Sequence, residues 1–124
     1  MTNETLQTIH SRRSCRAYEP RQITDAELDA VLEAGTYAAS AMGRQSAKIV
    51  VVQDAATRAQ LTRMNAAVMG TDSDPMYGAP TILVVLADAH ANCALQEGRL
   101  VMCIMMLAAA SQGLGRCRIN SARQ

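Results

Sequence analysis

The sequence predicts a mixed α and β fold in which a sheet lies between helices. Two short runs rich in valine, isoleucine and leucine, at 48–53 and 81–87, are typical of buried strands. Segments with apolar residues at helical spacing lie before, between and after these runs. Because a whole helix is expected between the two strands, they cannot form a hairpin.

Two helices are expected before the first strand. The first covers 3–12, with Leu6 and Ile9 on one face. The second covers about 25–37, because "TDAE" at 24–27 is a capping box in which the threonine caps the helix and the glutamate reaches back to it. Both helices therefore come early and are followed by a connector that leads into the first strand.

The region between the strands returns to helix. Asp54 can cap it, and Leu61, Met64 and Val68 form an apolar stripe at helical spacing. Two glycines and two prolines then mark 70–80 as a loop.

A long helix is expected over about 92–112, and Gly113 stands where a C-terminal glycine cap belongs. The helix is apolar almost all the way round between 100 and 110, an eleven-residue run that is too short to cross a bilayer. We expect it to lie at the centre of the fold or of an oligomer.

Composition excludes several classes of protein. The chain of 124 residues is long enough for one domain, and its 12 basic and 11 acidic residues leave no charge that would attract nucleic acid or an anionic membrane. Three tyrosines, with no phenylalanine or tryptophan, provide no platform for stacking single-stranded bases.

The four cysteines are widely spaced and include no CxxC pair. The N-terminus has no apolar core of a secretory signal, so we expect reduced thiols in a cytoplasmic protein. Neither His10 nor His90 forms a recognisable ligand spacing with these cysteines, and we therefore predict no metal site.

"SRRSCR" at 11–16 places Arg12, Arg13 and Arg16 around Ser14. One interpretation is a solvated helix end, with Arg12 and Arg13 in the last turn, where cations suit the helix dipole. The other is a phosphate site, because guanidinium groups and a serine hydroxyl donate well to phosphate oxygens.

Two further segments combine small and polar residues. "AASAMGRQSA" at 38–47 alternates them around Gly43 and can present backbone amides, although an ordinary helix-to-strand connector explains it equally well. "AAASQGLGRC" at 108–117 can likewise be a plain helix cap and turn. Each segment is unspecific when taken alone.

The order of the segments is more specific. The chain resembles the nitroreductase family of flavin enzymes in four successive segments: "RRSCRAYEPRQITDAELDAVLEAG", "AASAMGRQSAKIVVVQD", "YGAPTILVVLAD" and "LVMCIMMLAAASQGLGRCRI". The resemblance implies an α+β fold with a mixed or antiparallel central sheet flanked by helices, in a homodimer with FMN at two interface sites. It also implies that 1–124 is a single flavin-binding domain.

The resemblance assigns cofactor-binding roles to nine residues. In the family, the residues matching Arg12, Ser14 and Arg16 hold the FMN phosphate, ribityl chain and pyrimidine edge, and Arg13 belongs to the same motif. The partner subunit supplies the segment along the isoalloxazine, here Ser40, Ala41, Met42, Gly43 and Gln45.

The implied activity is transfer of a hydride from NAD(P)H, through the flavin, to nitroaromatic, quinone or similar small acceptors. No Ser-His-Asp set, carboxylate pair or activated cysteine is evident, and a flavin enzyme needs none because the cofactor carries the chemistry. We therefore predict no catalytic side chain.

Some positions depart from the family pattern. Ala39 and Ser46 replace prolines, and Cys103 and Ile104 stand where glycine and asparagine are usual. The family also continues beyond "RINSARQ" with a segment that embraces the partner and supplies another basic phosphate ligand. The alternative expectation is therefore a truncated, non-catalytic member that acts as a weak flavin-binding or dimeric scaffold module.

Overall fold

The computed structural model describes residues 1–120. The elements in chain order are α1 (Glu4–Ser11), α2 (Asp25–Thr36), the short 3-10 helix η1 (Ala41–Gly43), β1 (Lys48–Val52), α3 (Ala55–Met69), β2 (Ile82–Leu86) and α4 (Ala94–Ser111). Apart from η1, each was predicted from the sequence, and for the elements other than α3 the predicted ends lie within two residues of the observed ones.

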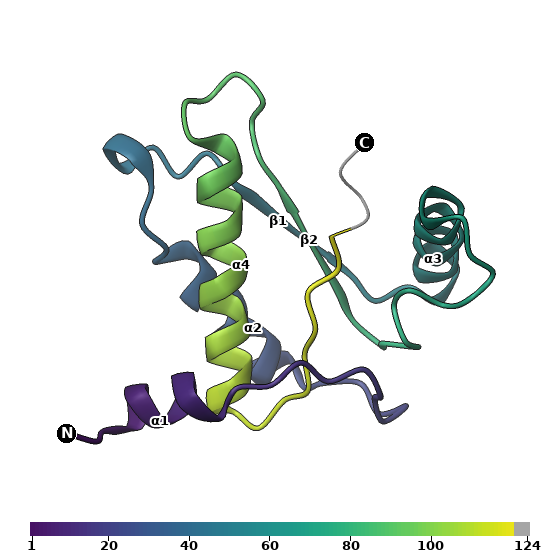
Figure 1. The fold of residues 1–124 in the computed structure, drawn as a ribbon, viewed down its shortest axis with the longest axis horizontal. Helices are drawn as coiled ribbons and strands as arrows, with labels where there is room; N and C mark the ends of the chain where they lie inside the picture. The colour runs from purple at the N-terminus through teal and green to yellow at the C-terminus, as the bar shows by residue number, and fades with distance from the viewer. Residues whose placement is uncertain (121–124) are drawn as a thin grey trace.

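The two strands form an antiparallel sheet whose register runs from Lys48 opposite Leu86 to Val52 opposite Ile82. α4 packs against α2 and β2, and α3 lies apart, beyond the far end of the strands (Figure 1). This arrangement confirms the predicted α+β class and antiparallel pairing. The strands were expected to be buried, but their residues are half-buried or exposed, since the helices of the core cover only part of the sheet.

The core forms where α2 and α4 meet. Val101, Met105 and Ala109 lie four residues apart on α4 and pack with Val31 of α2. Gly35 lets the two helices approach closely, because a Cβ atom at this position would lie 2.9 Å from side-chain atoms of both Ile49 and Met105. α4 is therefore the central helix of the chain, as predicted.

By length and composition α4 would also suit a membrane span, with a mean hydropathy of 1.3 over 18 residues. The buried positions Val101, Met105 and Ala109 instead form the core with α2, and a charged residue, Glu97, is also buried on this helix. Leu100 remains 45% exposed, so part of its apolar surface stays uncovered in the single chain.

Two local predictions need correction. α1 ends at Ser11, and the backbone turns away at Arg12 (φ −57°, ψ 127°), so Arg12 and Arg13 follow the helix and do not lie in its last turn. On α3 the predicted stripe is wrong: Met64 is 58% exposed and the buried residue is Asn65. The stripe has little to pack on, because α3 lies outside the α2–α4 core.

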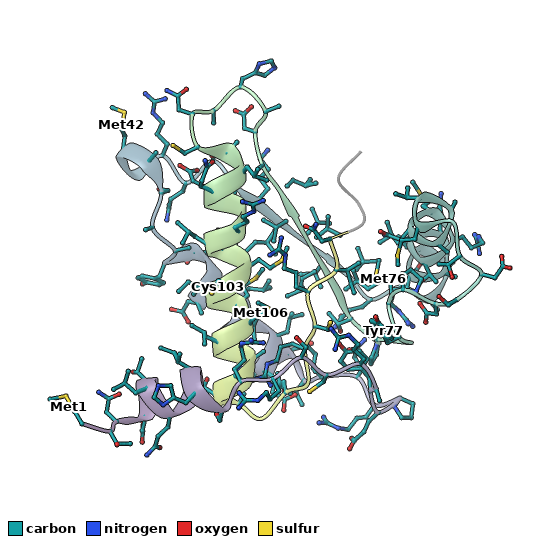
Figure 2. The ribbon with its side chains drawn as sticks, in the orientation of Figure 1. Met1, Met42, Met76, Tyr77, Cys103 and Met106 are labelled. Carbon is teal, nitrogen blue, oxygen red and sulfur yellow. The ribbon has the colours of Figure 1, made fainter. Side chains whose placement is uncertain are left out.

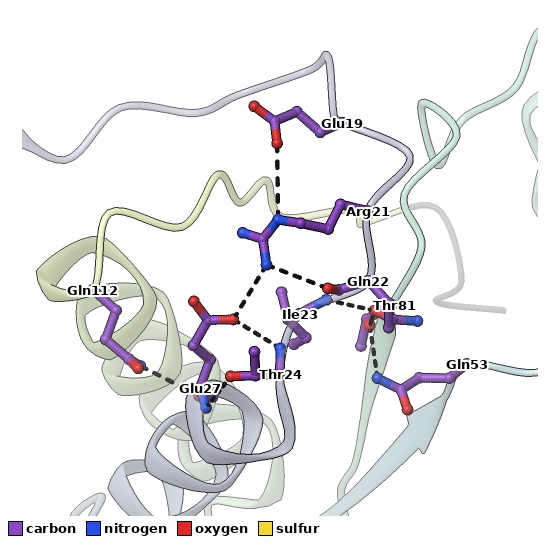
Figure 3. Close-up of polar contacts among 9 residues, drawn as sticks. All are labelled: Glu19, Arg21, Gln22, Ile23, Thr24, Glu27, Gln53, Thr81 and Gln112. Carbon is purple, nitrogen blue, oxygen red and sulfur yellow. Dashed lines mark hydrogen bonds and ion pairs between the residues drawn. The ribbon is translucent and has the colours of Figure 1, made fainter.

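Polar contacts join the start of α2 to the strands (Figure 3). The predicted capping box is present: Thr24 N–H donates to Glu27 at 2.8 Å, and Glu27 N–H donates to the Thr24 hydroxyl at 3.2 Å. Just before it, Gln22 accepts from the Thr81 hydroxyl, which accepts in turn from Gln53. These contacts fix the chain that leads from the arginine-rich segment into α2.

Candidate functional site

The arginine segment, residues 12–16, lies beside the C-terminal end of α4. These residues follow α1 and have no regular secondary structure. Cys15 N–H donates to the carbonyl of Arg116 at 2.9 Å. Tyr18 closes the same stretch by donating its hydroxyl to the Cys15 carbonyl at 2.9 Å. Burial of Tyr18, followed by the nearby Cys117 and Cys15, raises its pKa to about 12, so the hydroxyl keeps its proton at neutral pH.

The arginines of this segment differ in what they bond. Arg13 Nη1 donates to the carbonyls of His10 and Arg12, at 2.7 and 2.9 Å, so Arg13 caps the end of α1. The helix-end interpretation therefore applies to Arg13. Arg12, Ser14 and Arg16 make no side-chain hydrogen bond or ion pair with any residue in 1–120. Their donors remain available to a ligand.

Arg116 is a fourth arginine in this neighbourhood and was not singled out from the sequence. Its Nη1 donates to the Leu114 carbonyl at 2.9 Å, while its Nε is buried and has no partner within the described part of the chain. The backbone hydrogen bond with Cys15, about 100 positions away in sequence, brings Arg116 to the arginine segment. No local pattern in "GLGRC" indicates that contact.

The second candidate segment, the 40–46 loop, connects α2 to β1. Ser40, Gly43 and Gln45 line a shallow hollow of about 610 Å³ together with Thr36 and residues at the end of α2. Met42 is 86% exposed and points away from the rest of the chain (Figure 2). The loop thus presents small and polar groups, with one flexible apolar side chain at its outer end.

Glu97 holds this loop and was also missed from the sequence. It lies in the first turn of α4, accepts from Ala41 N–H at 2.7 Å and accepts from the Ser46 hydroxyl at 2.6 Å. The available signal was its register, since Glu97 is four residues before Val101 on the buried stripe. A carboxylate on such a stripe requires polar partners.

The structure does not bring the two segments together. The arginine segment lies beside the end of α4, and the loop is bonded to its first turn. An 18-residue helix separates them by roughly 27 Å. A single chain therefore cannot place both segments on one mononucleotide.

A larger apolar cavity of about 660 Å³ lies between α4, β2 and residues 113–120, and Met102, Met106 and Leu83 are among its lining residues. None of the nine predicted cofactor-binding residues lines it. Gly113 adopts a positive φ of 72° just after α4, which confirms the predicted glycine cap. The 108–117 segment thus contributes a helix end and the pairing with the arginine segment.

Comparison with known proteins identifies the family. Residues 9–123 match the model of the nitroreductase family. This chain belongs to the nitroreductase family. The predicted resemblance is confirmed over nearly its whole length.

Individual relatives agree. The chain is similar to a nitroreductase with bound FMN from Bacteroides fragilis, with 33% identity and a TM-score of 0.89 over 97% of this chain and 71% of that one. It is also similar to a nitroreductase with bound FMN from Desulfitobacterium hafniense, with 29% identity and a TM-score of 0.82 over 91% and 68% of the two chains.

A protein of Archaeoglobus fulgidus named "Putative NADH dehydrogenase/NAD(P)H nitroreductase" is 36% identical over 85 residues, which is 68% of this chain. The chain matches 46% of that relative's length.

Proposed function

We propose that this chain binds FMN and transfers a hydride from NAD(P)H to nitroaromatic, quinone or similar small acceptors. The observation that carries the proposal is the set of unpaired donors on Arg12, Ser14 and Arg16, in a chain that matches FMN-bound nitroreductases. The proposal includes a cytoplasmic, single-domain protein, in keeping with four free cysteines.

These residues suit a phosphorylated flavin. Two guanidinium groups and a hydroxyl that residues 1–120 leave unbonded provide charge-assisted donors for a phosphate. The backbone of Arg116, whose buried Nε has no partner among these residues, pairs with the same segment at Cys15. Arg12, Ser14 and Arg16 are proposed to hold the phosphate, ribityl chain and pyrimidine edge, while Arg13 fixes the segment to α1. A cation at the pyrimidine edge would stabilise negative charge developing there. When bound, FMN supplies the hydride chemistry, and no side chain is assigned a catalytic role.

The proposed site is shared between two chains of a homodimer. Ser40, Ala41, Met42, Gly43 and Gln45 would meet the flavin held by the arginine segment of the partner. The support for this is the separation of the two segments by the length of α4, together with uncovered apolar surface on α4 at Leu100. Dimer formation and cofactor binding would then be coupled.

The direct test is a titration of the purified protein with FMN, followed by NADH or NADPH oxidation with a nitroaromatic acceptor. We expect quenching of flavin fluorescence and acceptor-dependent oxidation of the reduced nicotinamide. Binding without oxidation would favour the alternative of a weak flavin-binding module. Absence of binding at millimolar FMN would contradict both the enzyme and the flavin-binding module and would favour the dimeric scaffold.

A complementation experiment tests the shared site. One variant carries Arg12→Ala and Arg16→Ala, and the other carries Gly43→Val, which forces a branched residue into a left-handed backbone (φ 65°). Each variant alone should bind FMN poorly. After mixing and exchange of subunits, half of the dimers are mixed and each has one intact site, so about a quarter of the sites should recover. No recovery despite exchange would contradict a site built from two chains.

A further inference from the structure

Glu97 is buried although it carries a carboxylate. Glu97 is 4% exposed, and no other charged residue within 1–120 is buried. It shares a face of α4 with Val101 and Met105, which form the core with α2. Burying a carboxylate is unfavourable unless hydrogen bonds replace the lost water. The bonds that replace the water here all come from one loop.

The two oxygens of Glu97 hold the two ends of the loop that carries the proposed flavin contacts. Oε1 accepts from Ala41 N–H, 56 positions away in sequence, and Oε2 accepts from the Ser46 hydroxyl, 51 positions away. The Ser46 hydroxyl, the Ala41 N–H and the charge of Arg44 lower the pKa of Glu97. The carboxylate is therefore ionised at neutral pH, and it joins α4 to the loop.

The backbone between these two contacts is strained. Met42 and Gln45 adopt left-handed conformations with φ of 55° and 47°, and Gly43 lies between them at 65°. Residues other than glycine keep such angles only where the surroundings impose them. Two more bonds restrain Gln45: its N–H donates to the Ser40 hydroxyl at 3.1 Å, and its Nε2 donates to the Thr36 carbonyl at 2.6 Å.

We propose that Glu97 is a positioning residue, which holds the 40–46 loop in its flavin-facing shape before any cofactor binds. The inference rests on the proposed function for the identity of the ligand. The contact with Ala41 N–H and Ser46 fixes both ends of the strained turn, so that the loop does not have to be ordered when FMN arrives. A loop that is ordered in advance binds more tightly, because the binding-competent fraction is larger.

The experiment compares Glu97→Ala with Glu97→Gln. A glutamine can accept from Ala41 N–H through its oxygen and donate to the Ser46 hydroxyl, so we expect Glu97→Gln to bind FMN within about twofold of the parent. Glu97→Ala leaves the loop without its anchor. If the competent fraction falls to about a tenth, the Kd for FMN rises about tenfold. Ser73→Ala, in a distant loop, is the control and should change nothing.

Hydrogen exchange gives a readout that needs no flavin. In the protein without FMN, the Ala41 amide should exchange faster in Glu97→Ala and remain protected in Glu97→Gln. If the parent binds no FMN, the proposed function fails, yet this measurement still decides whether Glu97 orders the loop. Equal protection and equal FMN affinity in the parent and Glu97→Ala would overturn the positioning role.

The pH profile separates positioning from simple packing. Arg44, from the loop, is the charged side chain that acts on Glu97. Because the pKa of Glu97 is lowered in the folded state, its contribution is complete above its ordinary pKa and is lost as pH falls through the lowered value. A protonated Glu97 can accept from Ala41 N–H and donate to the Ser46 hydroxyl as glutamine does, so in that acidic range the FMN affinity of the parent should fall by about twofold at most, to that of Glu97→Gln, and protonation of the FMN phosphate affects both equally. A fall of the parent in acid as large as the loss in Glu97→Ala would overturn a role that rests on these two hydrogen bonds.

Ser46→Ala covers the case in which Glu97→Ala does not fold. It removes one of the two contacts and keeps the carboxylate bonded to Ala41. We expect a Kd increase of about threefold, with the Ala41 amide still protected. An unchanged Kd for this variant would contradict an anchor that acts at both ends of the loop.

Discussion

The arginine segment and the 40–46 loop are the two candidate cofactor-binding regions, and they are built in opposite ways. Arg12, Ser14 and Arg16 form no side-chain hydrogen bond or ion pair within residues 1–120. In the loop, hydrogen bonds restrain a strained backbone, and two of them end on a buried carboxylate. The first region offers free hydrogen-bond donors to a ligand, and the second offers a backbone conformation that is already fixed. Substitutions should therefore act on charge in the first and on conformation in the second.

Preventing dimer formation, so that the two regions can no longer share a site, should have the largest effect. Leu100→Asp introduces a charge on the exposed apolar surface of α4, where we propose that a second chain packs. At micromolar concentration, sedimentation should show a dimer for the parent and a monomer for the variant, which should also lose FMN. Met64→Asp, at an exposed apolar position on α3, should stay dimeric. A parent that is monomeric and binds FMN tightly would contradict the shared site.

Removing one charge from the arginine segment should have the next largest effect. Arg16→Ala should raise the Kd for FMN about tenfold or more, as expected for the loss of one charged hydrogen bond, and leave the melting temperature nearly unchanged. Arg63→Ala, an exposed arginine of α3, is the matched control. A variant that keeps its flavin but melts earlier would show that Arg16 stabilises the fold and does not bind phosphate.

A change of backbone preference tests the loop. Gly43 and Gly70 both have φ of 65°, and a Cβ at either would meet no atom within 4 Å. Alanine at each position should therefore cost about 1 kcal/mol of stability through strain alone. Only Gly43→Ala should also weaken FMN binding, by up to about fivefold, because any strain that the free loop loses by relaxing has to be restored when FMN binds. Equal affinities for the two variants would show that the loop conformation is irrelevant to binding.

The helix cap shown in Figure 3 should matter for stability alone. Thr24→Ala removes the N-cap of α2 and should cost about 1 kcal/mol without changing FMN affinity. Hydrogen bonding, first from Thr24 N–H, lowers the pKa of Glu27. The contribution of this carboxylate is lost as pH falls through the lowered value. Because Thr24→Ala keeps the backbone N–H, both proteins should lose it, and thermal melts should show nearly the same difference between parent and variant at neutral and acidic pH.

Local signals in the sequence were sufficient for most of the fold. The capping residues Thr24 and Asp54, the β-branched runs and Gly113 each determine structure within a few positions, and the caps, strands and helix end were correctly placed. The burial of the strands was overestimated, because it depends on what covers the sheet. The bonds to Glu97 and the pairing with Arg116 join residues tens of positions apart, so they depend on tertiary packing that no local pattern encodes. The α3 stripe was misjudged because burial depends on which element lies opposite.

Asn65 is the one buried residue of α3, yet this helix also forms much of the connection between the two strands that must pair during folding. Val52 must find Ile82, 30 positions later, and Lys48 must find Leu86, 38 positions later, before the sheet exists. Closing such a loop lowers the entropy of the chain, and this cost comes before any strand contact forms to compensate for it. Once the 15 residues of α3 are helical they span roughly 22 Å, against roughly 50 Å when extended. Helix formation within about a microsecond would thus shorten the connection, and we expect α3 to contribute to the rate of folding more than to the stability of the folded state.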